Sequence, residues 1–103
     1  MSEAERYEKL VRHLLRTKLE HDAGATPSVQ HRAVFKGASG QRYEVDLSFE
    51  TTVAGARILV LVECKCYSRP VGVDDVAEFA YKVRDIGAHK GIVVATNPLC
   101  QDS

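Results

Sequence analysis

The sequence predicts a single α/β domain in which helices flank a mixed β-sheet, with elements in the order α-β-β-β-α-β. Three observations predict it: an amphipathic helix at the start, two strand-like segments joined by a glycine-containing connector, and two aliphatic runs separated by a second helix. The chain has 103 residues, which is enough for one hydrophobic core and too short for two. We therefore expect one domain over residues 1–103.

Composition narrows the class of protein. Apolar residues make up 45% and charged residues 27%, as in chains that fold into globular domains. The 14 Lys and Arg balance the 14 Asp and Glu, so nucleic-acid binding would require a local basic patch. The sequence contains no apolar run of the ~20 residues that a membrane helix needs, no signal-peptide pattern at the N-terminus, and no zinc-type spacing of its three cysteines. We expect a cytoplasmic protein with reduced thiols.

The first helix is expected over residues 3–21. Ser2 with Glu5 three positions later forms a capping-box pattern, and the segment DAGATPS ends the helix. Apolar side chains at helical spacing form its buried stripe: Tyr7, Leu10, Val11, Leu14, Leu15 and Leu19.

An antiparallel hairpin is expected next, because the connector KGASGQ joins two strand-like segments, residues 29–35 and 42–49. The second segment alternates between apolar and polar residues. Its apolar face contains Tyr43, Val45, Leu47 and Phe49, and its polar face contains Glu44, Asp46 and Ser48.

The second half of the chain predicts a β-α-β unit. After a turn over residues 50–56, RILVLVECKCY contains five consecutive aliphatic residues, which is typical of a central strand covered on both faces. A helix from about residue 73 to Gly87 and a further buried strand, GIVVAT, follow. The two strands should be parallel. We expect a second copy of the chain or an additional domain to cover the last strand.

Two charges interrupt the central strand. Glu63 and Lys65 lie two positions apart, so their side chains leave the same face, while Cys64 points to the other face. Unpaired buried charges cost several kcal/mol, so we expect this pair at the open end of the strand, facing a cleft. Asp46, on the polar face of the preceding strand, comes opposite or diagonal to Glu63 if the two strands are antiparallel. Two carboxylates and an ammonium would then converge.

This combination suits metal-assisted phosphodiester hydrolysis. Mg²⁺ favours one or two carboxylates and keeps water and phosphate oxygens in its other positions. The metal activates a bound water and polarises the phosphate, while a lysine orients the water or neutralises developing charge. The other interpretation of Asp46, Glu63 and Lys65 is a structural network of ion pairs. We favour the active site because three charged residues lie on neighbouring strands.

The motif YEVDL…VECK resembles the D…(D/E)xK motif of the PD-(D/E)xK nuclease superfamily, and the longer pattern resembles its Mrr-like restriction endonuclease group. The similarity continues through CKCYSRPVGVDDVAEF and KVRDIGAHKGIVVATN, and RYEKLVRHLL resembles the aromatic-Glu helix of that group. It covers nearly the whole chain. Val45 stands where the superfamily has its proline, and the sequence lacks the further helix and strand with which such domains usually finish.

The resemblance implies a restriction-endonuclease-like fold and cleavage of DNA with Mg²⁺, for which Mn²⁺ would substitute, leaving 5′-phosphate and 3′-hydroxyl ends. By the same resemblance, Asp46 and Glu63 would bind the metal, the backbone carbonyl of Cys64 would add a ligand, and Lys65 would be the catalytic lysine. Glu8 lies at a position that often assists the metal site, although a solvated helix glutamate is an equally good interpretation.

Candidate substrate contacts follow from their place near the motif. Arg69 and Tyr67 come after it at the open end of the strand, and the basic residues of the hairpin are weaker candidates, since dispersed Lys and Arg usually only solubilise. That second group contains Arg32, Lys36 and Arg42.

Other polar residues have simpler interpretations. We interpret Cys64 and Cys66 as small hydrophobes, and the four histidines as surface or loop residues, with a place near the substrate as the alternative for one of them. The second helix carries Asp74 and Asp75 as its cap and first turn, and Glu78 and Lys82 as a surface i, i+4 pair.

The sequence leaves alternatives open within this function. No segment recognisably reads base edges, so a structure-selective resolvase or an RNA-cutting effector nuclease is the alternative among enzymes. A catalytically silent nucleic-acid-binding or assembly domain of the same fold is the alternative outside enzymes. A homodimer is expected if both strands of a duplex are cut, because two sites are then needed.

Overall fold

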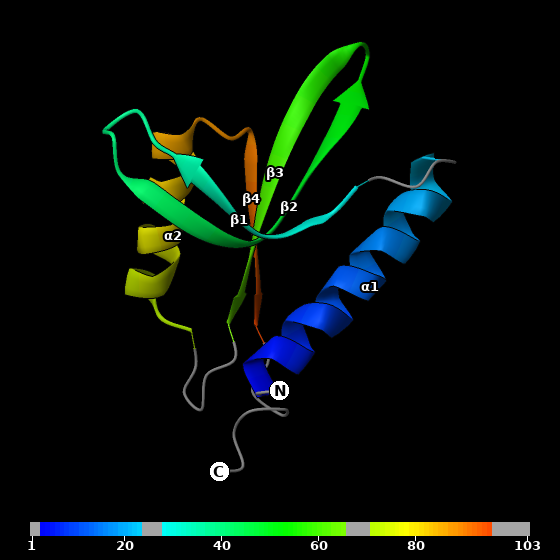
Figure 1. Cartoon of the computed structure of the whole chain (residues 1–103), viewed down its shortest axis with the longest axis horizontal. Helices are drawn as coiled ribbons and strands as arrows, with labels where there is room; N and C mark the ends of the chain where they lie inside the picture. Colours follow the sequence, from blue (N-terminus) through cyan, green and yellow to red (C-terminus); the bar gives the residue numbers. More distant parts are fainter. Residues whose placement is uncertain (1–2, 24–27, 66–70, 96–103) are drawn as a thin grey trace.

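The elements follow the predicted order. The computed structural model describes residues 3–23, 28–65 and 71–95. Figure 1 shows the strands between the two helices, with α2 on one side of the sheet and α1 on the other. The elements are α1 (Glu3–Ala23), β1 (Gln30–Lys36), β2 (Arg42–Val53), β3 (Ala56–Lys65), α2 (Val73–Ile86) and β4 (Lys90–Ala95).

The sheet is mixed, as the sequence predicts. Its strand order is β1-β2-β3-β4, in which β1 and β2 as well as β2 and β3 pair antiparallel, and β3 and β4 pair parallel across the α2 crossover. The prediction that β4 is a buried strand is only half right. Its central residues are partly buried because α2 covers one face and the strand lies at an edge of the described sheet.

The predicted turn over residues 50–56 is wrong. β2 continues to Val53 and β3 begins at Ala56, so the connection is a two-residue hairpin loop. Ala54 and Gly55 both have positive φ, 51° and 84°, which is the conformation that such tight loops require. Alanine at a left-handed position carries no turn signal in a sequence, so the sequence pattern indicates a turn that is longer than the observed one and begins too early.

Two hydrophobic clusters hold the layers together. The first lies between α1 and the sheet, and the second lies between the sheet and α2. β3 contributes to both, since Val60 and Val62 face the first cluster and Leu61 faces the second, which confirms a central strand covered on both faces. The buried members of the first are Tyr7, Val11, Val29, Leu47, Phe49, Val60 and Val62; those of the second are Val45, Leu61 and Phe79.

The predicted stripe of α1 is wider than the one that is buried. Tyr7 and Val11 are buried and Leu15 packs beside them, whereas Leu10 and Leu14 are exposed. A single sheet face covers only the side of the helix that contains residues 7, 11 and 15. Ser2 of the proposed capping box lies outside the described residues.

The β1–β2 hairpin bends in the middle. The ladder between the two strands is interrupted at one position, where Arg32 lies opposite Asp46, and Arg32 has a left-handed backbone with φ of 57°. Beyond this bend β2 changes sides: Leu47 packs in the first cluster, but Val45 packs in the second. The apolar residues of β2 are therefore buried as predicted, without sharing one core.

α2 begins and ends on glycines. Gly72 is the N-cap, and its backbone N–H donates to Oδ2 of Asp75 at 2.9 Å, so the expected capping role belongs to Asp75 and does not extend to Asp74. Gly87 closes the helix with φ of 84°. Asp75 lies in the first turn, where a carboxylate is also favoured by the helix dipole.

Asp85 connects the first hairpin to α2 through hydrogen bonds. Its carboxylate accepts hydrogen bonds from the Ser39 backbone N–H at 2.9 Å, the Ser39 hydroxyl at 2.6 Å and the Tyr43 hydroxyl at 2.8 Å. These bonds lower the pKa of Asp85, while burial and the bond to Asp85 raise the pKa of Tyr43 to about 12. Residues 42–46 of β2, which do not pair with β3, are thereby held near α2.

Candidate active site

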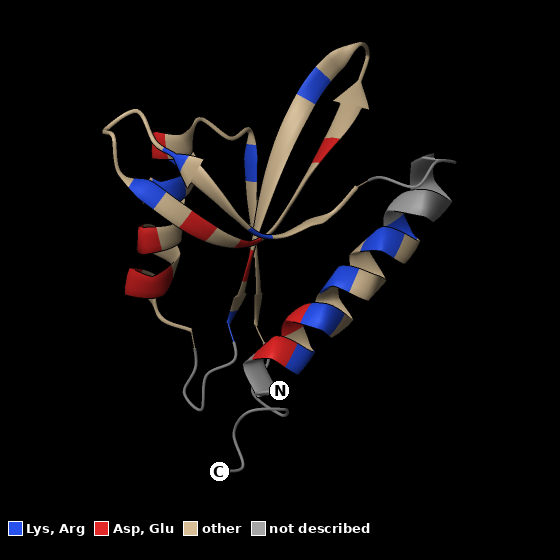
Figure 2. Ribbon diagram, viewed as in Figure 1, with Lys and Arg blue, Asp and Glu red and all other residues tan. Residues whose placement is uncertain are grey.

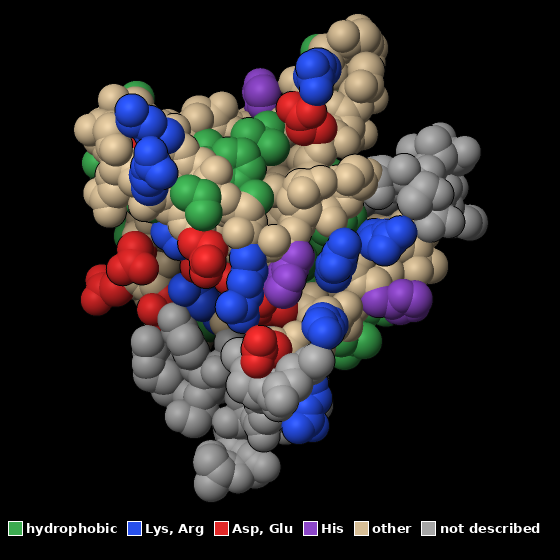
Figure 3. All heavy atoms as spheres, viewed as in Figure 1, with side chains coloured by type: hydrophobic (Ala, Val, Ile, Leu, Met, Phe, Trp, Pro, Cys, Tyr) green, Lys and Arg blue, Asp and Glu red, His purple; other side chains and the backbone are tan. Residues whose placement is uncertain are grey.

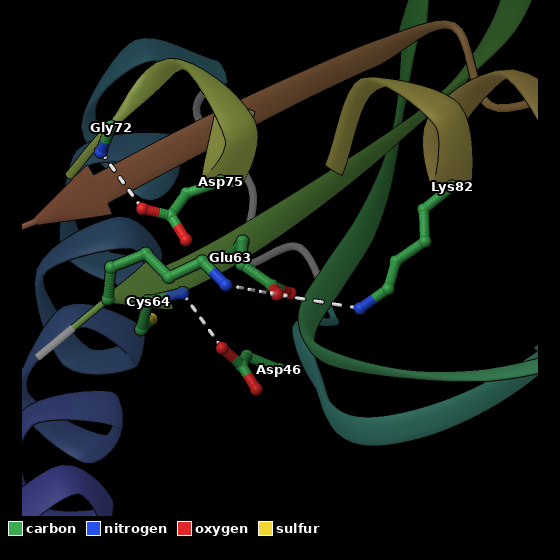
Figure 4. A network of polar contacts seen from close by, with 7 residues as sticks. Asp46, Glu63, Cys64, Gly72, Asp75 and Lys82 are labelled. Carbon is green, nitrogen blue, oxygen red and sulfur yellow. Dashed lines mark hydrogen bonds and ion pairs between the residues drawn. The ribbon is translucent and has the colours of Figure 1, made fainter. Parts of the chain in front are cut away.

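The sheet opens between β2 and β3 at the predicted motif. Their ladder extends from Val53 and Ala56 to Leu47 and Val62 and does not continue to the next positions, Asp46 and Glu63. Cys64, beyond this point on β3, donates its backbone N–H to Oδ2 of Asp46 at 2.8 Å. A side chain thus takes the place of the missing strand partner, and the two carboxylates lie where the strands separate (Figure 4).

Glu63 is the most buried of the predicted catalytic residues, with 7% of its surface exposed. Its Oε2 accepts from the Lys65 ammonium at 3.1 Å and lies 3.4 Å from the Lys82 ammonium. Its Oε1 is buried and has no hydrogen-bond partner among the described residues. An ionised oxygen left in this way is costly in a protein interior and needs a positive ligand or a donor.

The environment of Asp46 disfavours its charge. Burial raises the pKa of this carboxyl above its ordinary value, and the nearby carboxylates of Glu63 and Glu8 raise it further. The hydrogen bond from Cys64 and the charge of Lys82 act in the opposite direction. The carboxylates are therefore close enough to repel each other, which is the electrostatic condition that a bound cation relieves.

Lys82 is a site residue that the sequence interpretation missed. The i, i+4 spacing predicts a surface pair with Glu78, but Figure 4 shows Lys82 extending from α2 toward Glu63. Only 19% of its side chain is exposed. The signal was available in the helix periodicity, because position 82 lies beside the buried Phe79 and the packed Val83 on the face that meets the sheet.

Glu8 is not a solvated helix residue, because only 6% of its surface is exposed. Its Oε1 accepts from His31 Nε2 at 2.9 Å and from Arg32 Nε at 3.3 Å. Neither contact was foreseen: His31 was taken as a surface or loop residue and Arg32 only as a weak substrate contact. Both residues stand at the bend of β1, a feature that leaves no mark in the sequence.

The remaining candidates do not join this cluster. Lys36 and Arg42 face each other at the far end of the first hairpin, four residues or roughly 13 Å of strand away from Asp46. Arg69 and Tyr67 lie outside the described residues, as does Cys66. Across the described ranges, no group of three or more acidic, histidine or cysteine side chains is arranged to hold a metal ion.

Cys64 should be a poor nucleophile. Its side chain packs against the first cluster, and burial, followed by the charge of Asp46, raises the pKa of its thiol from 9.0 to about 12. We expect iodoacetamide at pH 8 to alkylate Cys64 in the folded protein roughly 100-fold or more slowly than in urea, because few thiolates form. Peptide mass spectrometry measures both rates; equal rates would contradict the burial of this side chain.

Comparison with known proteins agrees with this architecture. The model of the Mrr catalytic-domain family, described as restriction endonuclease, matches residues 1–103. No curated protein and no solved structure matches the chain. Neither described helix is long and apolar enough to cross a membrane. With the split sheet, the Asp46–Glu63–Lys65 arrangement and the match over the whole sequence, the chain belongs to the Mrr-like restriction endonuclease family of the PD-(D/E)xK nucleases.

Proposed function

We propose that this nuclease domain is a metal-dependent endonuclease that hydrolyses phosphodiester bonds of DNA. The observation that carries the proposal is the buried, unpartnered Oε1 of Glu63 beside the Asp46 carboxylate, at the point where the sheet opens. A purely structural ion-pair network would satisfy both oxygens of a buried carboxylate. A divalent cation would satisfy Oε1 and reduce the repulsion between the two acids.

The donor set fits Mg²⁺, with Mn²⁺ as a substitute. Asp46 and Glu63 supply two carboxylates, and no described residue donates a hydrogen bond to Oδ1 of Asp46. The Cys64 carbonyl is a third candidate ligand: in an extended strand the N–H and C=O of one residue point to the same side, and this N–H points into the gap toward Asp46. Water and phosphate oxygens would complete the shell, as Mg²⁺ prefers.

The residues around the metal site would have different roles in the reaction. When bound, the metal would supply Lewis acidity and an activated water. Lys65, whose Nζ lies 3.1 Å from Glu63, would donate a hydrogen bond to a phosphate oxygen or to the attacking water. Lys82 holds the Glu63 carboxylate from the α2 side and acts as a positioning residue. Glu8 remains a candidate helper of the metal through its second oxygen.

Several finer expectations accompany this proposal. We favour DNA over RNA as the substrate because the chain belongs to a restriction endonuclease family. The predicted substrate contacts remain Arg69, Tyr67, Arg42 and Lys36. A second copy or an additional domain beside β4 remains a prediction as well, favoured by the edge position of that strand.

Cleavage assays on supercoiled and linear DNA with Mg²⁺ or Mn²⁺ test the proposal. Wild type should cut only with metal, and Lys65→Ala should reduce cutting by about 10²- to 10³-fold through loss of charge stabilisation. A folded wild type that binds DNA or RNA but cuts neither would support the silent-domain alternative. Cleavage of a control RNA in preference to DNA would support an RNA-cutting enzyme.

A further inference from the structure

Charge is distributed unevenly across a chain whose formal net charge is zero. Residues 9–18 of α1 contain four basic residues and no acidic one. α2 contains four acidic residues, Asp74, Asp75, Glu78 and Asp85, against the two basic residues Lys82 and Arg84. Figure 2 shows this basic stretch along the middle of α1 and the acidic residues of α2, on either side of the sheet. A polyanion approaching the site is therefore attracted more strongly to the middle of α1 than to α2.

The basic residues of α1 form one surface. Lys9, Arg12, His13 and Arg16 lie three, four and seven positions apart and line a shallow hollow of about 240 Å³. No carboxylate among the described residues forms an ion pair with Lys9, Arg12 or Arg16. The buried Nε of Arg12 also has no hydrogen-bond partner there. Within residues 9–18 no acidic residue interrupts this surface.

Arg32 extends this surface to the active site. Its Nε is held by Glu8, its side chain is 40% exposed, and no described residue pairs with its terminal nitrogens. Its left-handed backbone costs on the order of 1 kcal/mol, and such conformations concentrate at functional sites. Because Arg32 faces Asp46 across the hairpin bend, it stands between the metal-binding carboxylates and α1. Figure 3 shows Lys, Arg and His side chains gathered along α1 and the adjoining part of the sheet.

We propose that Arg32, Lys9, Arg12 and Arg16 bind the sugar-phosphate backbone of the nucleic-acid substrate beside the cleaved bond, so that the duplex lies across α1. This rests on the proposed function for the class of substrate. From residue 9 to residue 16 the helix rises about 10 Å, along which a duplex presents on the order of six phosphates on its two strands. Guanidinium groups suit this role because their planar fork binds phosphate oxygens in pairs.

The test is the salt dependence of binding. A fluorescent 30-base-pair duplex is titrated with protein at several NaCl concentrations, without divalent metal, and anisotropy gives the dissociation constant. Each phosphate contact contributes about 0.9 to the slope of log affinity against log salt. We expect Lys9→Gln/Arg16→Gln, two exposed positions, to reduce the slope by about 2, and Arg32→Gln to reduce it by about 1.

Arg57→Gln is the matched control. This exposed arginine pairs with Glu50 near the β2–β3 hairpin loop and loses the same charge. The salt slope of Arg57→Gln should equal that of wild type. A decrease in slope as large as that of Arg32→Gln would overturn the proposal, because it would show a general effect of charge. If wild type binds and cuts with Mg²⁺ while the α1 variants keep the wild-type slope, the inference fails and the proposed function stands. If wild type neither binds nor cuts, both fail.

Discussion

Asp46→Asn should abolish metal-dependent cleavage and leave the protein at least as stable as wild type at pH 7. Loss of a metal-binding carboxylate removes the charge stabilisation of the reaction, and we expect a decrease of at least about 10²- to 10³-fold. Stability should not fall, because the asparagine Oδ1 can still accept from the Cys64 N–H and the buried negative charge is gone. Cleavage assays and thermal unfolding measure the two effects.

The pH dependence of this stability difference has a definite sign. Because the pKa of Asp46 is raised from 3.8, the folded state binds a proton more tightly than the unfolded state. Its contribution to stability is present at acid pH and is lost as pH rises through the folded pKa. The Tm advantage of Asp46→Asn should therefore be larger at pH 7 than at pH 4.

Metal and a neighbouring residue provide the controls for this prediction. Mg²⁺ should raise the Tm of wild type by binding only the folded state, and should leave the Tm of Asp46→Asn unchanged. Glu44→Gln removes an exposed carboxylate from the same strand and should alter neither cleavage nor Tm. A marked drop in the Tm of Asp46→Asn would instead identify Asp46 as a structural residue.

Glu63→Gln should also abolish cleavage, but with the opposite effect on stability. Glu63 is buried and its carboxylate compensates the ammonium groups of Lys65 and Lys82, which are largely shielded from water. A neutral amide no longer forms an ion pair with either ammonium, and the loss of these two partly buried contacts should cost on the order of 2 kcal/mol. In a domain of this size that corresponds to a decrease in Tm of about 10 °C.

A double-mutant cycle separates this effect from a general loss of packing. Adding Lys82→Gln to Glu63→Gln removes the ammonium that has lost its Glu63 partner, so the double variant should recover part of the lost stability. Glu50→Gln breaks the exposed pair with Arg57 and should lower Tm by little, since surface pairs are worth about 0 to 1 kcal/mol. Additive effects of the Glu63 and Lys82 changes would show that the contact carries no energy.

Together the two substitutions distinguish an active site from an ion-pair network. In a network, each charge contributes to stability and each removal costs stability. In the proposed site, the Asp46 carboxylate lowers stability, whereas the Glu63 carboxylate is stabilised by two lysines. Opposite shifts in Tm with a shared loss of cleavage are expected only if the pair is preserved for its chemistry.

Periodicity and local chemistry determined much of this protein from the sequence. The order of the elements, the antiparallel and parallel pairings and the burial of β3 on both faces follow from patterns within short segments. The proximity of Glu63 to Lys65 follows from spacing on one strand, and that of Asp46 to the same strand end follows from the hairpin. These are local properties, because neighbours along one strand or across one turn are set by backbone geometry.

Tertiary structure alone decided where the sheet opens and what surrounds the motif. The bend at Arg32 and Asp46 depends on Asp85 and α2 holding one half of the hairpin while α1 packs against the other, a balance between distant contacts. Lys82 and Glu8 reach the site only because their helices dock on opposite faces of the sheet. Periodicity indicates which side of a helix meets the sheet, as at position 82, but which strand residue that side meets depends on packing between elements far apart in the chain.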